Sequence, residues 1–238
     1  MASPHFIIMD TETTGVDCET DRLVELAGVT LDDVQFTTLV NPERDIPPEA
    51  RAIHHISPDE VAYAPSEEEA LLAFQNALHP APPERPIIYT AHNAKFDRGF
   101  IDRIKPVNNL FWVCTMKVAM TLWPDAPKFS NQVLRYWLNL EVSTPPDLFP
   151  HRALYDCIIT RAILAKALET HSPRELVEIT QNPVLLKWCR MGKHAGKLWT
   201  DVDSGYLNWV KNNRDDENEI FTAEHHLSRR GGGFKGRR

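Results

Sequence analysis

Short apolar runs bounded by turn residues predict the strands of a sheet in the first half of the chain. Runs of this length, rich in Ile, Val and Phe, are typical of buried strands. The first run ends at Asp10, and an acidic turn at residues 31–33 separates the next two, which favours an antiparallel hairpin. The predicted strands cover residues 6–9, 23–29, 34–40, 87–90 and 111–113.

Helical periodicity and capping patterns predict helices after these strands. Ser66 and Ser172 are each followed three positions later by glutamate, a capping box that opens a helix. Apolar residues cover most of the circumference of a predicted helix over 152–168, so we expect it to be well buried. Residues 41–65, rich in proline and charge, predict a long loop with room for one helical turn. The other predicted helices cover residues 66–78, 94–104, 115–122 and 130–139, with a short one near 206–210.

A hairpin followed by alternating strands and helices predicts an α/β fold, with helices on the faces of a mixed sheet. Asp10 and Glu12 then lie on the central strand, whereas Asp97 and Asp156 come from helices packed beside it. The capping box at Ser172 suggests a domain boundary just before it. We therefore expect a main domain over residues 1–170, a small accessory module over 171–227 and a flexible basic tail over 228–238.

The charge of the chain changes sharply at its C-terminal end. The net charge is −7, yet residues 229–238 hold five basic residues and no acid, which leaves 21 basic against 33 acidic residues, or −12, before them. An acidic body argues against an overall electrostatic attraction to nucleic acid. The basic glycine-rich end is either a tether to a phosphate backbone or a solvated terminus.

Hydropathy and cysteine usage indicate a cytoplasmic protein with no membrane segment. Hydrophobic residues make up 42% of the chain, enough for a sizeable core, but no apolar run approaches the length of a membrane span. No basic segment followed by an apolar one marks the N-terminus as a signal peptide. Cysteines at positions 18, 114, 157 and 189 are scattered without a C-x-x-C pair, so we expect reduced thiols.

Four carboxylates and one histidine are the candidate chemical groups. Asp10 and Glu12 are two residues apart, so a strand places them on the same face. His151 and Asp156 converge only if the histidine lies on the loop before the helix. Each segment alone has an ordinary explanation, such as a turn acid or a surface histidine. Together with Asp97 they predict a site for divalent metals, which relieve the repulsion between carboxylates, with a histidine to accept a proton.

Three motifs in this order resemble the DnaQ-like 3′→5′ exonucleases, in their histidine-bearing (DEDDh) branch. They are Asp-x-Glu-Thr-Thr-Gly at 10–15, His-Asn-x-x-Phe-Asp at 92–97 and His-x-Ala-x-x-Asp at 151–156. Residues 52–57 are similar to a further family segment, and the motifs downstream of residue 190 are similar to those of the exonuclease X group. The resemblance covers roughly residues 5–170. It implies a ribonuclease H-like fold with a mixed five-stranded sheet flanked by helices.

The resemblance also implies a role for each group. The enzyme would release nucleoside 5′-monophosphates from DNA 3′ ends by a two-metal mechanism, with two Mg²⁺ ions for which Mn²⁺ can substitute. Its implied catalytic residues are Asp10, Glu12, Asp97, His151 and Asp156, with the four carboxylates as metal ligands and the histidine as general base. Its implied substrate-binding residues are Thr11, Thr13, His55, Asn93 and Phe96.

Basic and aromatic residues alternate in the predicted accessory module. Lys193, Lys197 and Trp199 suit contacts to a nucleic-acid backbone and its bases. The alternative is a small helical cap whose aromatic residues pack against the main domain.

Other functions stay open on the sequence alone. The expected substrate is single-stranded DNA or a DNA 3′ end, as in DNA repair, with any polymerase or repair partner on a separate chain. A 3′→5′ exoribonuclease is an alternative, because no residue clearly reports on recognition of the 2′-OH. A non-catalytic nucleic-acid-binding module or a scaffold protein could share the same fold.

Overall fold

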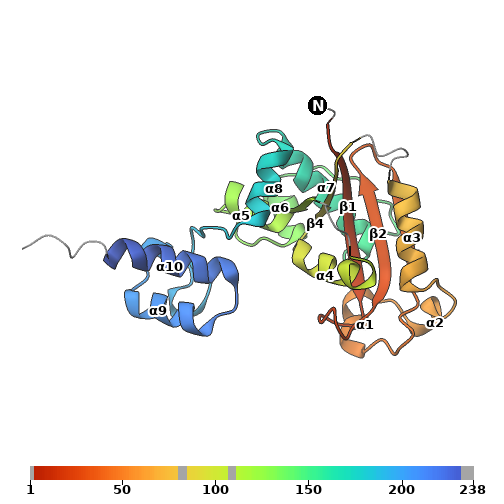
Figure 1. The fold of residues 1–238 in the computed structure, drawn as a ribbon, viewed down its shortest axis with the longest axis horizontal. Coiled ribbons are helices and arrows are strands. Elements are labelled where there is room, and N and C mark those ends of the chain that lie inside the picture. The colour runs from red at the N-terminus through yellow and green to blue at the C-terminus, as the bar shows by residue number, and fades with distance from the viewer. Residues whose placement is uncertain (1–2, 80–84, 107–110, 232–238) are drawn as a thin grey trace, which may run out of the picture.

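The computed structural model describes residues 3–79, 85–106 and 111–231. A five-stranded mixed sheet lies at its centre, with strand order β3-β2-β1-β4-β5 (Figure 1). Strands β2 and β3 pair antiparallel, which confirms the predicted hairpin. The central strand β1 pairs antiparallel with β2 and parallel with β4, which confirms the mixed sheet. The strands are β1 (His5–Thr13), β2 (Leu23–Thr30), β3 (Gln35–Leu39), β4 (Ile87–Ala91) and β5 (Phe111–Cys114).

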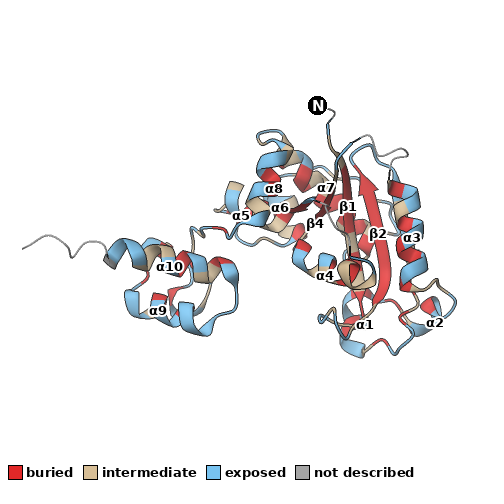
Figure 2. Cartoon of the chain, in the orientation of Figure 1, coloured by how far each residue is buried: buried red, intermediate tan, exposed pale blue. Residues whose placement is uncertain are grey.

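Alternation along β1 decides which helices cover which face of the sheet. Ile7 and Met9 point into a core shared with α3 and α4, whereas Phe6 and Ile8 point into a second core shared with α5, α7 and α8. Figure 2 shows the buried strands of the sheet and the exposed residues on the helices around it. These helices are α3 (Glu67–Leu78), α4 (Ala94–Ile104), α5 (Thr115–Leu122), α7 (Ala153–Leu168) and α8 (Pro173–Gln181).

The segment over residues 41–65 is more ordered than the single helical turn we expected. It contains α1 (Pro48–His54) and α2 (Pro58–Val61), and each begins with proline, which suits the first helical position because that position needs no N–H donor. Ile46, Ile56 and Val61 bury against Val24 of β2, so packing stabilises these short helices. We interpreted the prolines of this segment as signs of a loop, whereas Pro48 and Pro58 each begin a helix.

The predicted domain boundary near residue 171 is wrong, because α8 belongs to the main domain. Leu176 and Val177 of α8 lie in the same core cluster as α7 and the sheet. The Thr180 hydroxyl also accepts a hydrogen bond of 2.8 Å from the backbone N–H of Cys114 in β5. The capping box at Ser172 therefore starts another helix of the first domain rather than a new domain.

A separate small core forms after residue 183. It contains α9 (Ser204–Asn213), α10 (Glu217–Gly231) and the short helical turns η1 (Gly192–His194) and η2 (Trp199–Asp201). This C-terminal module, residues 184–231, lies beside the main domain in Figure 1. Its buried members are Cys189, Trp199, Val202, Leu207, Val210 and Ala223.

Residues 228–231, predicted as the start of a flexible tail, are helical. Helix α10 continues through residues 228–231, and the Arg230 guanidinium donates hydrogen bonds to the carbonyls of Thr200 and Val202 at 2.6 and 2.7 Å. The sequence pattern did not reveal α10, because its polar residues outnumber the few that reach the module core. The rest of the expected tail, residues 232–238, lies outside the described residues.

The module contacts the main domain through the loop between α5 and α6 (Asn131–Trp137). Lys187 forms an ion pair of 2.7 Å with Asp125, and the Trp188 indole donates 2.8 Å to the same carboxylate. The Arg190 guanidinium lies 4.5 Å from the centroid of the Phe129 ring and donates to three carbonyls of this loop.

Two further expectations concern the chain as a whole. Among the described helices, none is both long and apolar enough to span a bilayer. All four cysteines are free thiols, as predicted, and three of them are buried.

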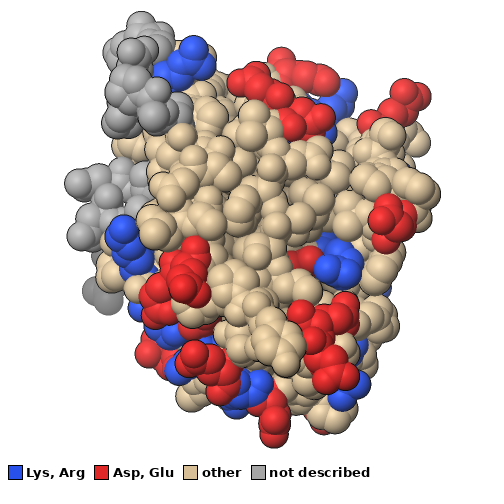
Figure 3. All heavy atoms as spheres, turned by 90° about the vertical axis from the view of Figure 1, so that its right-hand side faces the viewer, with Lys and Arg blue, Asp and Glu red and all other residues tan. Residues whose placement is uncertain are grey.

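The face drawn in Figure 3 carries acidic side chains with Lys and Arg interspersed, rather than a continuous basic surface.

Candidate active site

Three carboxylates meet at the face of β1 that α7 covers. Asp10 and Glu12 continue the side of the strand on which Ile8 lies, and Asp156 lies in the first turn of α7. One oxygen atom from each carboxylate lies within 4.8 Å of the others. The structure therefore brings together three of the four predicted metal ligands, from positions far apart in the sequence.

Asp97 lies beside this cluster, in the first turn of α4. It is 2% exposed, and its Oδ1 accepts a hydrogen bond of 2.8 Å from the Thr11 hydroxyl. Thr11 points toward α4 because it alternates with Asp10 and Glu12 along the strand. The Asp97 carboxylate is outside the three-oxygen cluster, but its charge still acts on Asp10.

Burial raises the pKa of the four predicted ligands, and repulsion from neighbouring carboxylates adds to the effect at Asp10, Glu12 and Asp97. The pKa of Glu12 rises to about 9 and that of Asp97 to about 7. The pKa of Asp10 lies well above its ordinary value, and burial also raises that of Asp156. Arg152 lowers the pKa of Glu12, but less than burial and the neighbouring acids raise it. Such a group of carboxyls is suited to hold divalent cations, which replace the missing positive charge.

His151 is located on the loop that leads into α7, as its spacing from Asp156 required. Its backbone has a left-handed conformation, with φ of 65°, and its N–H donates 2.9 Å to Oδ2 of Asp156. The side chain is exposed at the edge of the carboxylate cluster. This placement leaves the imidazole accessible to solvent.

Sequence reasoning missed a buried ion pair that anchors the start of α7. Glu25 on β2 lies opposite Glu12 in the strand register and is 3% exposed. Its carboxylate accepts hydrogen bonds from Arg152 at 2.6 and 3.1 Å and from the N–H of Ala153 at 2.9 Å. A single acid inside the apolar run over 23–29 was the available signal, since a buried carboxylate needs a partner.

Asn131 is a second contact that the sequence did not suggest. Its side-chain amide donates to Oδ1 of Asp156 at 3.3 Å and to the hydroxyl of Thr160 at 3.2 Å. With the backbone of His151 on the other oxygen, both carboxylate oxygens of Asp156 are held. An asparagine at the start of a helix is common, so its residue type alone carried no signal.

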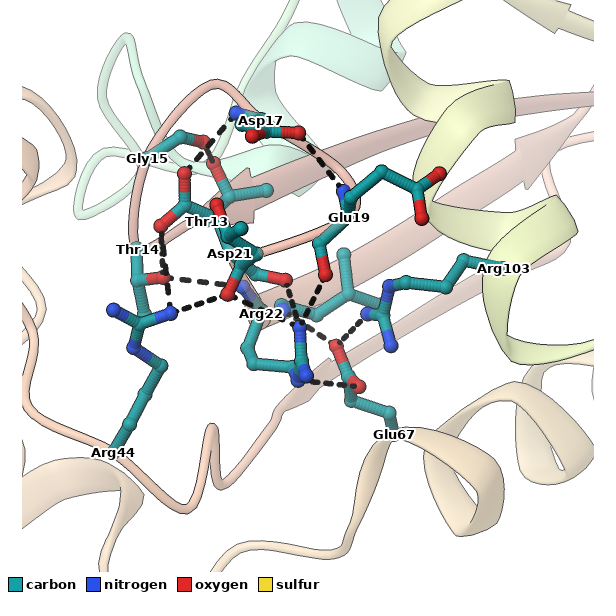
Figure 4. Close-up of polar contacts among 12 residues, drawn as sticks. Thr13, Thr14, Gly15, Asp17, Glu19, Asp21, Arg22, Arg44, Glu67 and Arg103 are labelled. Atoms are coloured by element: carbon teal, nitrogen blue, oxygen red, sulfur yellow. Dashed lines mark hydrogen bonds and ion pairs between the residues drawn. The ribbon is translucent and has the colours of Figure 1, made fainter.

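The loop after β1 is fixed by a polar network (Figure 4). Asp21 accepts hydrogen bonds of 3.1 Å from the Thr14 hydroxyl and from the N–H of Asp17. Glu67, at the start of α3, accepts from the N–H of Leu23 at 2.8 Å and from Arg103 at 2.6 Å. These contacts hold the loop against α3 and α4. They also hold Thr13, which directly precedes the loop.

A glycine is required at the tightest point of this loop. A Cβ atom on Gly15 would lie 2.3 Å from Oδ2 of Asp21, inside the network. The Thr13 hydroxyl donates to the Gly15 carbonyl at 2.5 Å. Gly15, which ends the first motif, therefore lets Asp21 come close enough to accept a hydrogen bond from Thr14.

The predicted substrate-binding residues come from β1, the end of α1 and the start of α4. Asn93 precedes α4 in a left-handed conformation with φ of 66°, and Phe96 in the first turn packs 5.1 Å from Phe100, measured between ring centroids. His55 ends α1, is exposed and lies 6.1 Å from the ring of Phe149. Thr11 and Thr13 are buried, so their side chains are held rather than free.

One predicted contact residue of the module is wrong. Trp199 is 1% exposed and is the largest side chain of the module core, so it cannot stack on a base. An aromatic residue in a basic segment has the same sequence pattern whether it stacks on a base or packs in a core. Lys193 and Lys197 remain exposed, and Lys193 lies 3.9 Å from Asp203 and 5.7 Å from the Tyr206 ring.

Comparisons with known proteins extend this picture. A family model described as "Exonuclease" matches residues 7–164. Exodeoxyribonuclease 10 of Escherichia coli K12 is 38% identical over 231 residues, which cover 92% of this chain and 97% of that protein. The DNA polymerase III subunit epsilon of Treponema pallidum is 27% identical and covers 76% of this chain and 86% of that protein.

Solved structures share the fold of the main domain. A structure of exonuclease X in complex with 5′ overhanging duplex DNA is 38% identical, with a TM-score of 0.60, and covers 74% of this chain and 99% of that one. A structure of E. coli exonuclease I with single-stranded DNA has a TM-score of 0.58 at 20% identity and covers 75% of this chain and 43% of that one, so that likeness concerns the fold alone.

Proposed function

Because the chain belongs to the DnaQ-like exonuclease family and is a 3′→5′ exonuclease, we propose that it hydrolyses DNA from the 3′ end and releases nucleoside 5′-monophosphates. The observation that carries the proposal is the group of three half-buried carboxylates, each with an oxygen within 4.8 Å of the others. Structural proteins rarely retain such a self-repelling group, whereas metal-dependent phosphodiester hydrolysis requires one.

Divalent cations fit these residues. Asp10, Glu12 and Asp156 would hold them directly, and Asp97 would support the same site from α4. Bound cations would neutralise charge on the scissile phosphate and acidify water. We propose two Mg²⁺ ions, replaceable by Mn²⁺, because hard cations prefer oxygen ligands. The raised pKa values support this proposal, since they report a deficit of positive charge.

The remaining groups of the site have roles suited to a substrate strand. His151, exposed beside Asp156, would accept a proton from the attacking water. Asn131 and the backbone of His151 would keep Asp156 oriented. Thr11, Thr13, His55, Asn93 and Phe96 would contact the 3′-terminal nucleotide.

DNA is the proposed polymer, and single strands or unpaired 3′ ends are the proposed form. The names of the relatives support this choice: one is an exodeoxyribonuclease, and one similar structure holds 5′ overhanging duplex DNA. An exoribonuclease remains the alternative for this site.

The C-terminal module is proposed to bind the nucleic acid upstream of the cleaved end. Most of its basic side chains already have partners within the protein, such as Lys211 with Glu224 and Arg214 with Glu219. Lys197 is exposed next to Gly196, whose φ of 84° shapes the turn and whose surroundings are open. Lys193, on the other side of this turn, is exposed as well, although it lies 3.9 Å from Asp203. This turn is the surface of the module best placed for phosphate contacts.

The test uses 5′-labelled single-stranded DNA and RNA of equal sequence, incubated with Mg²⁺, with EDTA and with the Asp10→Asn variant. We expect a ladder that shortens from the 3′ end, requires both Mg²⁺ and Asp10, and forms faster on DNA. A faster RNA ladder would replace the proposed substrate by the alternative. Binding without any cleavage would overturn the catalytic proposal.

A further inference from the structure

Phe149 is an exposed aromatic residue close to the carboxylate site, and the proposed function gives it no role. Phe149 is 41% exposed and precedes His151 by two residues, a span of about 7 Å at most. Its ring centroid lies 6.1 Å from that of His55, with an angle of 49° between the planes. The two rings come from different segments, so together they form an open aromatic surface beside the site.

The Phe149 ring has a fixed support on another side. The Arg152 guanidinium lies 5.9 Å from the ring centroid. That guanidinium donates three hydrogen bonds to Glu25, at 2.6, 3.1 and 3.2 Å, and Glu25 in turn caps the N-terminus of α7. Because Glu25 neutralises and orients Arg152, the arginine supports the ring instead of reaching for a phosphate.

His55 is also fixed in place. It ends α1 in a left-handed conformation, with φ of 60°, and its N–H donates 2.9 Å to the carbonyl of Arg51. The neighbour of Phe149 in sequence, Leu148, packs into the core clusters, whereas Phe149 points outward. The aromatic surface is therefore preorganised, and its exposure does not arise from an unpacked loop.

We propose that Phe149 and His55 form a stacking site for a nucleobase within the last two nucleotides of the substrate strand. A nucleobase is the ligand that fits this surface. If the carboxylate cluster and its cations bind the phosphate of a nucleotide, the planar base of the same strand lies next to them. Stacking on aromatic rings accepts every base, as a sequence-independent exonuclease requires. This inference rests on the proposed function and adds the binding of bases to it.

The stacking site has a measurable signature. Stacking that is equal in the bound substrate and the transition state affects KM and leaves kcat unchanged. Loss of one stacked base costs roughly tenfold in affinity, within the range measured for aromatic stacking of bases. An abasic nucleotide at the stacked position should therefore imitate the loss of the Phe149 ring.

The experiment measures binding and turnover of single-stranded oligonucleotides that carry an abasic nucleotide at the last, the second-last or the sixth position from the 3′ end. Fluorescence anisotropy in the Asp10→Asn background gives binding without hydrolysis. The variants are Phe149→Ala, Phe149→Trp and, as a matched control, Phe111→Ala, which removes an equally exposed ring at the start of β5.

We expect Phe149→Ala to weaken binding of intact DNA about tenfold and to remove the penalty of an abasic nucleotide at one of the last two positions. Phe149→Trp should restore both, and Phe111→Ala should change neither. Unchanged binding in Phe149→Ala, with the abasic penalty intact, would overturn the inference. That result would leave the exonuclease proposal standing, since the latter fails only if wild-type protein makes no metal-dependent ladder.

Discussion

Glu12 illustrates how the carboxylate site opposes folding when no cation is bound. Its pKa rises to about 9 from an ordinary value of 4.5, and that of Asp97 rises to about 7 from 3.8. The folded chain therefore retains protons that the unfolded chain releases between about pH 4 and 9. When the folded state binds more protons, its stability falls as pH rises.

The resulting prediction concerns thermal unfolding in EDTA. We expect the Tm to fall by several degrees between pH 5 and pH 9, and the fall to be smaller in Asp10→Asn, which removes one charge from the cluster. Added Mg²⁺ should flatten the dependence in wild-type protein. Asp45→Asn, a change at an exposed acid away from the site, is the control. A Tm that is constant or rises with pH in EDTA would contradict the pKa shifts.

His151 carries a separate prediction, because the hydrogen bond that it donates to Asp156 comes from its backbone N–H. His151→Ala should lower kcat by about 10²–10⁴-fold, the range typical of a positioned general base, while metal affinity changes little. Single-turnover cleavage and Mn²⁺ titration measure the two effects. Wild-type rates at neutral pH in this variant would show that another group accepts the proton.

The sequence predicted the carboxylates but not the residues that hold them. Asp10 and Glu12 follow from the period of a strand, and the loop position of His151 follows from its distance to Asp156. Glu25 and Asn131 could not be predicted in this way, because their contacts depend on which strand pairs with β1 and on how the loop before α6 returns to α7. Trp199 was assigned wrongly because its burial depends on a module core that local pattern does not reveal.

Among the contacts between elements, the link between β2 and α7 matters most for the position of the metal ligands. Glu25 joins the two through Arg152 and the N–H of Ala153, and α7 carries Asp156. The sheet thereby fixes the position of a metal ligand located on a helix. Breaking a buried ion pair by removing one partner costs about 3–5 kcal/mol, because the other charge remains buried.

We predict that Glu25→Gln lowers both stability and kcat, the latter by at least tenfold, because α7 loses its anchor to the sheet. Urea unfolding and steady-state kinetics measure the two. Arg152→Gln in the same background should restore part of the stability, since it removes the unpaired charge. If the two single changes and the double change were simply additive, the proposed coupling between β2 and α7 would be absent.

Local signals located most elements well, and their failures share a cause. The capping boxes at Ser66 and Ser172 both form, since each involves residues three apart. Helices α1 and α10 were missed because packing, rather than their own sequence periodicity, stabilises them. The prolines before and in α1 indicated a loop, and the many polar residues of α10 hid its helical pattern. Both helices are stabilised by packing against other parts of the molecule.

At the scale of the whole molecule, the boundary between the two cores decides which truncations can fold. Helix α8 buries Leu176 and Val177 against the sheet, whereas residues 184–231 form their own core. The sequence alone could not locate this boundary, because the capping box at Ser172 does not coincide with the change of core.

A pair of truncations tests this organisation. We expect residues 1–183 to fold and to cleave short oligonucleotides with a normal kcat, but to bind long substrates more weakly and with less dependence on salt. Residues 1–171 should be destabilised by several kcal/mol, because large side chains leave the core. Equal KM values and salt dependence for full-length protein and residues 1–183 would remove the proposed role of the module.

The central claim is that the carboxylate cluster binds divalent cations, and Mn²⁺ binding tests it most directly. Electron paramagnetic resonance, in the presence of a nucleoside 5′-monophosphate, counts the ions bound to wild-type protein, to Asp10→Asn and to the control Asp45→Asn. The account predicts about two tightly bound ions in wild-type protein and in the control, and loss of tight binding in Asp10→Asn. Equal binding by wild-type protein and Asp10→Asn, or no tight binding by either, would contradict it.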